Sequence, residues 1–335
     1  MINMKHMYIR FLAVAFSVAF WIVAACGCGN NVSVQDGHSS ESQALDPVSV
    51  GIYASFPTLP VREYPKHIST GYSCEVKEYS KSTQPIEALT AGEVDVCVSA
   101  LPSVLQAQLD GHKVKILCNF YQKGSAVVTA TEQNITSIEK LAGKVVGYTD
   151  GSMEYAQLRA DLYNRKIDAG SITWKEMEPS ELNEALQSGT IDAYCGDAAL
   201  AGTAFMEGYG KILSYPYASD LGYGNLVLVT TEDKINEKRD WIQEIVNANY
   251  QVMEMVTPLD DFGLSSAKEF GLDAAGIQQE RDNYQWVWDI EEEYVMFTRN
   301  LCNYFFQMGI FQTMPDMNTL FDFTFLENRS QEFVR

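Results

Sequence analysis

The sequence is poor in positive charge. Its 335 residues include 24 Lys and Arg against 44 Asp and Glu, so the formal net charge at pH 7 is −20. The basic residues are scattered along the chain, and no five-residue window is dominated by them. A surface of this sign repels the phosphates of nucleic acids and of anionic lipids. We therefore expect no nucleic-acid partner.

The sequence also lacks the side-chain groupings that carry most enzymatic chemistry. Its four histidines, at positions 6, 38, 67 and 112, form no metal-ligand spacing with one another or with cysteine. There is no recognisable Ser-His-Asp set and no glycine-rich phosphate loop with a trailing lysine. We therefore expect no catalytic role, no metal and no other cofactor.

The cysteines give no disulfide framework. They stand at positions 26, 28, 74, 97, 118, 195 and 302, and the last five contain no Cys-x-x-Cys pair. Cys97, Cys118 and Cys195 lie in apolar, strand-like runs, which indicates buried small side chains. A disulfide is left open, because spacing alone assigns no pairing.

What the sequence does contain at its N-terminus is the pattern of an export signal. Lys5 and Arg10 precede an apolar run from Phe11 to Ala25, the layout of a signal peptide. The run is shorter than the about 20 apolar residues of a membrane span. Residues 23–26 (VAAC) have the pattern of a bacterial lipobox. We expect a signal peptide over residues 1–25 and lipidation of Cys26.

Two other interpretations of this segment stay open. It is either a plain signal peptide that is cleaved elsewhere or a short anchor helix, and Cys28 is a second, less well placed lipidation candidate. Residues 26–46 hold few apolar side chains, which suits a flexible tether between a lipid and a folded domain.

From Pro47 onward, β-branched runs alternate with stretches of helical periodicity. This alternation predicts an α/β fold in which helices cover a mostly parallel sheet. Strands are expected over residues 48–53, 75–79, 94–99, 114–120, 145–148, 173–177 and 191–195. Helices are expected over residues 84–91, 101–109, 153–164, 181–187 and 199–207. Aromatic residues at near-helical spacing from Trp286 to Phe305 predict further helices packed on the first unit.

A weak internal repeat indicates two units of similar design. The segment from Glu87 to Asp95 (EALTAGEVD) recurs from Glu184 to Asp192 (EALQSGTID), 97 residues later. In both copies a glycine follows a helix, where it can close the last turn, and a buried strand comes next. Chance similarity between two helix–strand junctions is the alternative. Two α/β units place a ligand site in the crevice beyond the carboxyl ends of their strands.

Several segments resemble the substrate-binding proteins of ABC transporters of the nitrate, sulfonate and taurine type, a group that includes receptors for thiamine-pyrimidine precursors. After the lipobox these are EALTAGEVDVCVSALPSVLQAQLDG, SIEKLAGKVVGYTDGSMEYAQLRADL and LNEALQSGTIDAYCGDAALA, and the resemblance covers residues 47–327. It implies a type II periplasmic-binding-protein fold, in which two lobes close on one small molecule.

The resemblance also implies the organisation of the lobes. Lobe 1 would comprise residues 47–122 and 226–335, with the C-terminal helices in its second part, and lobe 2 residues 123–225. The chain would cross between them near residues 121–125 and 217–225. Gly124, Gly222 and Gly224 would permit the backbone rotation of a hinge, unless they only shape surface turns.

The turn Gly151-Ser152 is the first candidate site. It joins a predicted strand to a predicted helix, and free N–H groups at a helix start favour an anionic or hydrogen-bond-accepting group. In the resembled family the matching turn holds a sulfonate or similar group. Ser152 as a plain helix cap is the alternative, and the two roles can coexist.

Further candidates follow other predicted strands or lie near the crossovers. Asp197 would need a donor on the ligand, unless it only caps the next helix. The ligand stays open between a sulfonate-like or nitrate-like anion and a nitrogen-bearing ring such as a pyrimidine, which the nearby acids favour. The remaining predicted ligand-binding residues are Phe56, Ser80, Ala100, Tyr121, Tyr155 and Tyr223.

Together these features predict an extracytoplasmic, membrane-anchored lipoprotein that binds a small solute. As the resemblance implies, it would be a monomeric receptor that closes on its solute and delivers it to an ABC permease. The alternatives are a lipoprotein that senses solute and signals to a membrane partner, and a pyrimidine-synthase-like enzyme. The enzyme is disfavoured because the sequence shows no cysteine cluster.

Overall fold

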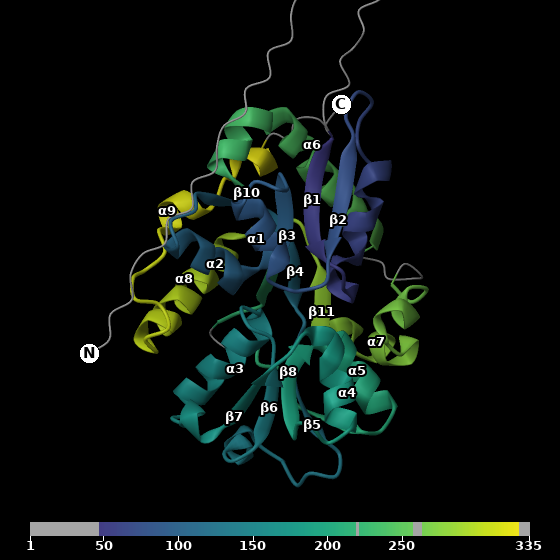
Figure 1. The fold of residues 1–335 in the computed structure, drawn as a ribbon, viewed down its shortest axis with the longest axis vertical. Coiled ribbons are helices and arrows are strands. Elements are labelled where there is room, and N and C mark those ends of the chain that lie inside the picture. The colour runs from purple at the N-terminus through teal and green to yellow at the C-terminus, as the bar shows by residue number, and fades with distance from the viewer. Residues whose placement is uncertain (1–46, 219–220, 257–262, 328–335) are drawn as a thin grey trace, which may run out of the picture. The chain divides into compact units, whose positions relative to one another are not determined.

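The structure, a computed structural model, describes residues 47–218, 221–256 and 263–327 (Figure 1). The predicted signal peptide, the tether and Cys26 lie outside the described residues. No helix within the described ranges is long and apolar enough to cross a membrane.

The first sheet has six strands in the order β11-β4-β10-β3-β1-β2. β1 pairs in parallel with β2 and β3, whereas β10 runs antiparallel to β3 and β4, and β11 antiparallel to β4. Successive residues of β1 are buried, because helices cover both faces of the sheet. The strands are β1 (Val48–Tyr53), β2 (Cys74–Tyr79), β3 (Val96–Ala100), β4 (Val114–Lys123), β10 (Gly224–Thr231) and β11 (Tyr284–Trp286).

The second sheet has five strands in the order β7-β6-β8-β5-β9. β6 pairs in parallel with β7 and β8, and β5 runs antiparallel to β8 and β9. The strands are β5 (Ser125–Ala130), β6 (Val145–Tyr148), β7 (Thr173–Glu176), β8 (Ala193–Asp197) and β9 (Gly210–Ser214).

Helices cover both faces of each sheet. On the first sheet, α6 and the 3-10 helix η1 (Phe56–Lys66) pack on one face, and α1, α2 and α8 pack on the other. On the second sheet, α3 covers one face and α4 and α5 cover the other. The helices are α1 (Gln84–Thr90), α2 (Leu101–Leu109), α3 (Met153–Asn164), α4 (Leu182–Gln187), α5 (Ala198–Met206), α6 (Glu232–Val256), α7 (Ala274–Gln279), α8 (Glu292–Gln307) and α9 (Met317–Leu320).

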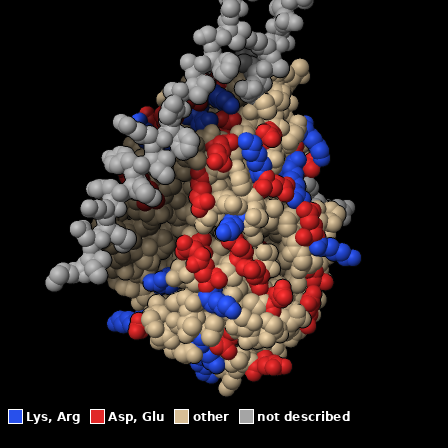
Figure 2. Space-filling view, viewed as in Figure 1, with Lys and Arg blue, Asp and Glu red and all other residues tan. Residues whose placement is uncertain are grey.

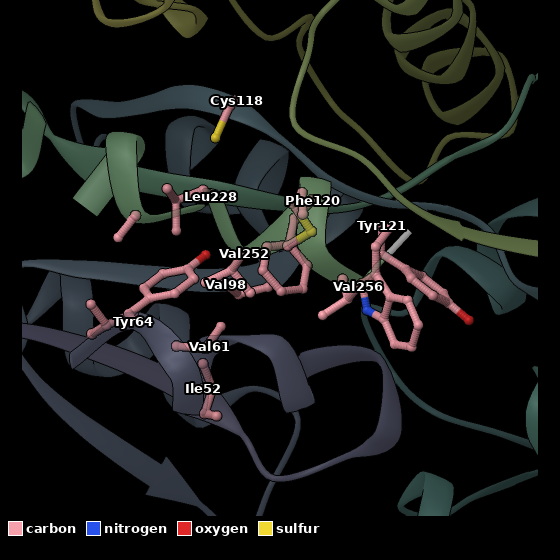
Figure 3. Close-up of a cluster of buried hydrophobic side chains, with 14 of the residues drawn as sticks. Ile52, Val61, Tyr64, Val98, Cys118, Phe120, Tyr121, Leu228, Val252 and Val256 are labelled. Atoms are coloured by element: carbon pink, nitrogen blue, oxygen red, sulfur yellow. The ribbon is translucent and has the colours of Figure 1, made fainter. Parts of the chain in front are cut away.

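The core between the first sheet, η1 and α6 is drawn in Figure 3. Ile52, Val61, Phe120 and Val252 are buried there together with Tyr64. The Tyr64 hydroxyl donates a hydrogen bond of 2.6 Å to Asn249 Oδ1, so this buried polar group has a partner. Ile52 and Phe120 come from runs that predicted strands, whereas Val61, Tyr64 and Val252 belong to η1 and α6, which were outside the predicted elements.

The two copies of the internal repeat occupy equivalent places in the two sheets. The Asp95 carboxylate accepts a hydrogen bond of 2.9 Å from the Ser49 N–H on β1, and the Asp192 carboxylate accepts one of 2.9 Å from the Val145 N–H on β6. Each aspartate also donates its own N–H to the carbonyl of that same residue. The repeat thus reflects two units built in the same way. In each unit the aspartate links the first strand to the strand that follows the repeat by two hydrogen bonds.

Asp95 carries a second interaction that Asp192 lacks among the described residues. The ammonium groups of Lys234 and Lys238 lie 3.1 and 3.0 Å from its two carboxylate oxygens. Burial alone would raise the pKa of Asp95, but the Ser49 N–H and the two ammonium groups outweigh burial and lower this pKa below its ordinary value. The ion pair therefore stabilises the folded state at neutral pH.

The first connection between the two sheets is very short. β4 ends at Lys123 and β5 begins at Ser125, so Gly124 alone separates the two sheets there, with a left-handed φ of +76°. The chain returns between β9 and β10. The predicted lobe boundaries after residues 122 and 225 stay predictions.

A third link is the contact between α5 on the second sheet and α7. α7 belongs to the segment that the sequence assigned to lobe 1, yet it packs on α5. A Cβ atom built on Gly202 of α5 would lie 2.3 Å from the carbonyl oxygen of Gly276 on α7. The two glycines therefore allow the helix backbones to touch.

Comparison with the sequence shows where the predictions hold. β1, β6, α2 and α3 have the predicted bounds, and α8 confirms a helix from Tyr294 to Phe305. The prediction of a mostly parallel sheet is wrong, because both sheets are mixed. The strands β5, β9, β10 and β11 were outside the predicted ones, and each pairs antiparallel with its neighbours. Trp286, expected in a helix, lies in β11.

Candidate functional site

A cavity of about 570 Å³ lies where the carboxyl ends of strands from both sheets face each other. Its lining includes Tyr53 at the end of β1, Tyr79 at the end of β2 and Ala100 at the end of β3. From the second sheet it includes Thr149 after β6 and Asp197 at the end of β8. This is the crevice in which open α/β sheets bind ligands.

Most of the predicted ligand-binding residues line this cavity. The structure brings together seven of them: Phe56, Ser80, Ala100, Tyr121, Gly151, Ser152 and Asp197. Tyr155 and Tyr223 are absent from its lining and border two smaller cavities instead. The Tyr155 ring lies 4.2 Å from that of Tyr148, centroid to centroid, and accepts the Arg159 guanidinium over its face at 5.4 Å. Tyr155 therefore serves packing on the second sheet.

Hydrogen bonds join the elements of the two sheets around the cavity. Ser103 Oγ on α2 donates to the carbonyl oxygen of Gly151 over 3.0 Å, and the Ser82 N–H donates to the Glu178 carboxylate over 3.0 Å. The Tyr121 hydroxyl on β4 donates to Asp197 Oδ2 over 2.8 Å. The cavity is therefore held by contacts that link the lobes on several sides.

Asp197 has two tasks at once. Its Oδ1 accepts a hydrogen bond of 2.8 Å from the Ala199 N–H, which caps α5, and its Oδ2 accepts the bond from Tyr121. The side chain is partly exposed and lines the cavity, so the cap and the binding role predicted for it coexist. Burial, followed by the nearby charge of Glu154, raises the pKa of Asp197 from 3.8 to about 7.

Glu154 is a second carboxyl in the same place. It stands in the first turn of α3, lines the cavity, and accepts a hydrogen bond of 2.9 Å from Asn225 Nδ2 at the start of β10. Burial raises the pKa of Glu154, although the Asn225 amide, its own backbone N–H and the Ser152 hydroxyl all donate to it. Neither Glu154 nor Asn225 was among the predicted site residues. The signal for Glu154 was its place two residues after the Gly-Ser turn.

The start of α3 carries an acid and a cap where the sequence suggested a site for an anion. Ser152 Oγ accepts a hydrogen bond of 3.2 Å from the Tyr155 N–H, and the Glu154 carboxylate interacts with its own N–H. Gly151 makes the turn with a φ of +66°. The helix start thus presents a carboxyl to the cavity beside its N–H groups, and this carboxyl disfavours an anion there.

Positive charge is scarce around the cavity. Arg62 is the one basic side chain among the lining residues that the structure describes. Its guanidinium lies 2.6 Å from a Glu78 oxygen and 2.7 Å from a Glu269 oxygen, and these two hydrogen-bonded partners raise its pKa. Figure 2 shows basic side chains dispersed among acidic ones on the face in view. The cavity therefore has no uncommitted cation among its described residues to receive an anion.

Aromatic rings form one wall. Phe56 lies 5.6 Å from Tyr284 and 5.3 Å from Trp286, and Tyr121 stacks on Tyr284 at 6.0 Å, all between ring centroids. Phe56 and Tyr121 line the cavity, and the other two rings support them from behind. Such a wall suits a flat or apolar part of a small molecule.

No metal-binding group and no disulfide occur in the part of the chain that the structure describes. No three or more His, Cys, Asp and Glu side chains of the described residues are placed to hold a metal ion. The five described cysteines form no disulfide with one another, and Cys97, Cys118 and Cys195 are buried as the sequence indicated.

Comparisons with known proteins connect this architecture to a family. The model of the NMT1/THI5-like family matches residues 69–257. A comparison with curated protein sequences gives no match.

Similar solved structures support the fold. The aliphatic sulphonate-binding protein of Escherichia coli has 16% identity and a TM-score of 0.68, over 82% of this chain and 91% of its own. The nitrate-binding protein of Synechocystis has 11% identity and a TM-score of 0.72, over 86% and 89%. A Candida albicans protein with the generic periplasmic-binding-protein fold has 15% identity and a TM-score of 0.65, over 83% and 96%. The predicted fold of two α/β lobes with a cleft between them is confirmed.

Proposed function

Because the chain belongs to the NMT1/THI5-like family, we propose that it is the solute-binding receptor of an ABC importer and acts by binding, not by catalysis. One observation carries the proposal: the cavity at the facing strand ends is enclosed by hydrogen bonds between the lobes. A volume of about 570 Å³ suits one small organic molecule. The solved structures of similar fold include binding proteins for sulfonate and nitrate, which supports the same kind of role.

The proposed mechanism is a hinge closure. Solute enters when the lobes are apart, and closure forms the contact of Ser103 with Gly151 and of Tyr121 with Asp197. Gly124, between the two sheets in a left-handed conformation, absorbs the backbone rotation. A membrane permease then distinguishes the closed receptor from the open one, because only closure brings both lobe surfaces into one relative position.

We further propose that the receptor is exported, anchored by lipid on Cys26 outside the cytoplasm, and monomeric. The charge pattern and the lipobox of the first 26 residues support the anchor. A receptor tethered near the membrane meets its permease at high effective concentration.

Binding is tested by unfolding the purified protein in the presence of sulfonates, nitrate, pyrimidines and amines. A ligand at 100 times its dissociation constant adds about 2.7 kcal/mol to the free energy of unfolding. The same ligand is expected to reduce the radius of gyration in small-angle X-ray scattering. Ala100→Trp, which fills the cavity, should abolish both effects, whereas Ala142→Trp on an exposed turn should leave them. If no class of solute changes melting or size, the proposal is refuted.

The importer role is tested separately. Permease and ATPase genes beside the gene for this chain, and solute uptake that depends on all three, are expected of a transport receptor. Uptake that persists after deletion of this chain contradicts that role and leaves a sensor of solute as the better description.

A further inference from the structure

Two acidic side chains, Glu154 and Asp197, lie in the same part of the cavity. We propose that Glu154 and Asp197 together bind a nitrogen cation of the solute, such as a protonated amine, an amidine or a protonated nitrogen heterocycle. The inference rests on the proposed solute-binding function and narrows its ligand to a chemical class.

The first step is that the two carboxyls lie in the same part of the cavity. A Cβ atom built on Gly124 would lie 3.0 Å from Asp197 Oδ2 and 3.2 Å from Asn225 Nδ2, and this same amide nitrogen donates to Glu154 over 2.9 Å. The charge of Glu154 also acts on Asp197. A ligand in this part of the cavity therefore meets both carboxyls.

The second step is that both carboxyls keep room for further donors. Each oxygen of Asp197 accepts one bond, from Ala199 and from Tyr121, and the Glu154 carboxylate has three donors, Asn225 Nδ2, its own N–H and the Ser152 hydroxyl. A carboxylate accepts up to about four hydrogen bonds, whereas an ammonium offers three donors and an amidinium a planar pair. Both residues are partly exposed and line the cavity, so the free acceptor sites are accessible to a ligand.

The third step is charge. The cavity lining has five acids, at positions 78, 150, 154, 197 and 269, against Arg62, which is already bound to two of them. Two like charges in one partly buried place repel each other unless a counter-charge arrives. A cation relieves this repulsion, whereas a sulfonate or nitrate increases it.

An independent observation also indicates a ligand. Ser99, on the β3 edge of the cavity, is 3% exposed, and its hydroxyl has no hydrogen-bond partner among the described residues. Buried hydroxyls are rarely left without a partner. A second polar group on the solute, within the same cavity, would supply it.

The test uses three probes of one shape: benzamidine, benzamide and benzenesulfonate. Melting of the purified protein is followed with each probe, in the wild type and in the Glu154→Gln and Asp197→Asn variants. Glu184→Gln, an exposed acid on α4 outside the cavity, is the matched control for the loss of one negative charge. Benzylamine and benzyl alcohol repeat the comparison for an amine.

We expect the cations alone to raise the melting temperature of the wild type and of the control. Each cavity variant should weaken the cation at least about ten-fold, with folding of the variant checked by circular dichroism. If cations bind the variants as well as the wild type, or if sulfonates or neutral probes bind in their place, the carboxyl inference fails while the receptor function stands. If no probe and no solute of the wider panel binds, both fail.

Discussion

Stability without solute should be limited by the charge of Asp197, and Asp197→Asn should relieve that limit. The pKa of this carboxyl rises from 3.8 to about 7 in the folded protein, because burial and Glu154 both oppose its ionisation. At about 1.4 kcal/mol for each pH unit between these values, ionising the folded protein costs at most about 4 kcal/mol. Because the side chain is partly exposed to the cavity, we expect about 2 kcal/mol.

The sign of the pH dependence follows from which state holds the proton. Between pH 4 and pH 7 the folded protein keeps the Asp197 proton longer than the unfolded chain does, so this group makes stability fall as pH rises. Above pH 7 both states are ionised, and the loss is complete. Asparagine cannot ionise, yet it caps a helix as well as aspartate does. The Tyr121 hydroxyl can turn to accept a bond from the new amide.

Asp197→Asn should therefore be about 2 kcal/mol more stable than the wild type at pH 8 and nearly equal to it at pH 4. Urea unfolding at pH 4, 6 and 8 measures the difference, in which titrating groups remote from Asp197 cancel. Glu154, whose charge raises the pKa of Asp197, loses that repulsion in the variant and adds to the gain. Asp168→Asn, the same change at an exposed helix cap, is the control and should show no such trend. A variant that is less stable at pH 8, or a gap of equal size at every pH, would refute the reasoning.

Three further predictions concern the backbone and the buried ion pair. Gly151→Ala should lower the free energy of unfolding by about 1–2 kcal/mol, because the φ of Gly151 is left-handed. It should also weaken solute binding measured by calorimetry, because the new Cβ would clash with the Ser103 hydroxyl of the facing lobe. Gly92→Ala, at a left-handed glycine with open space around it, should cost similar stability and leave the affinity unchanged. Gly202→Ala should lower the free energy of unfolding by more than about 2 kcal/mol despite the better helix propensity of alanine, because of the contact with Gly276. Asp95→Asn should cost about 3 kcal/mol at pH 7 in urea unfolding, and the cost should shrink as pH falls below 3.8, since the lowered pKa of Asp95 makes this stabilisation a feature of the ionised state.

The sequence predicted the elements whose signals are local. β1 and β6 are short runs rich in β-branched residues, and α3 begins directly after Ser152, a capping residue whose hydroxyl accepts a hydrogen bond from the Tyr155 N–H. β11 escaped prediction because it has three residues and derives its strand character from pairing with β4. The sequence also failed to predict the strand directions, because these depend on where the chain crosses from one sheet to the other.

In the candidate site, too, the sequence predicted what depends on the order of elements and missed what depends on contacts between distant residues. The rule that ligands bind beyond strand ends identified positions such as Ser80 and Asp197, because it needs only the order of elements. The partner of Glu154 could not be identified in this way, since Asn225 lies 71 residues away and meets it only in the folded chain. Tyr155 was placed in the cleft because it lies near a predicted strand end. On a helix each residue is rotated by about 100° from the one before it, so Tyr155 points in another direction than Glu154. Its ring packs on Tyr148 and does not line the cavity.

Likeness in fold to anion receptors and an acidic cleft are compatible, because different residues determine the two. Buried side chains such as Val50 and Val146 build the lobes, and residues that follow the strands determine what enters between them. Glu154 stands in the first turn of α3 and lines the cavity, so the place where a helix could receive an anion already holds a carboxyl. Asp197 adds a second one, and Arg62 is occupied by two glutamates. We therefore infer the sign of the ligand from these side chains and not from the fold that carries them.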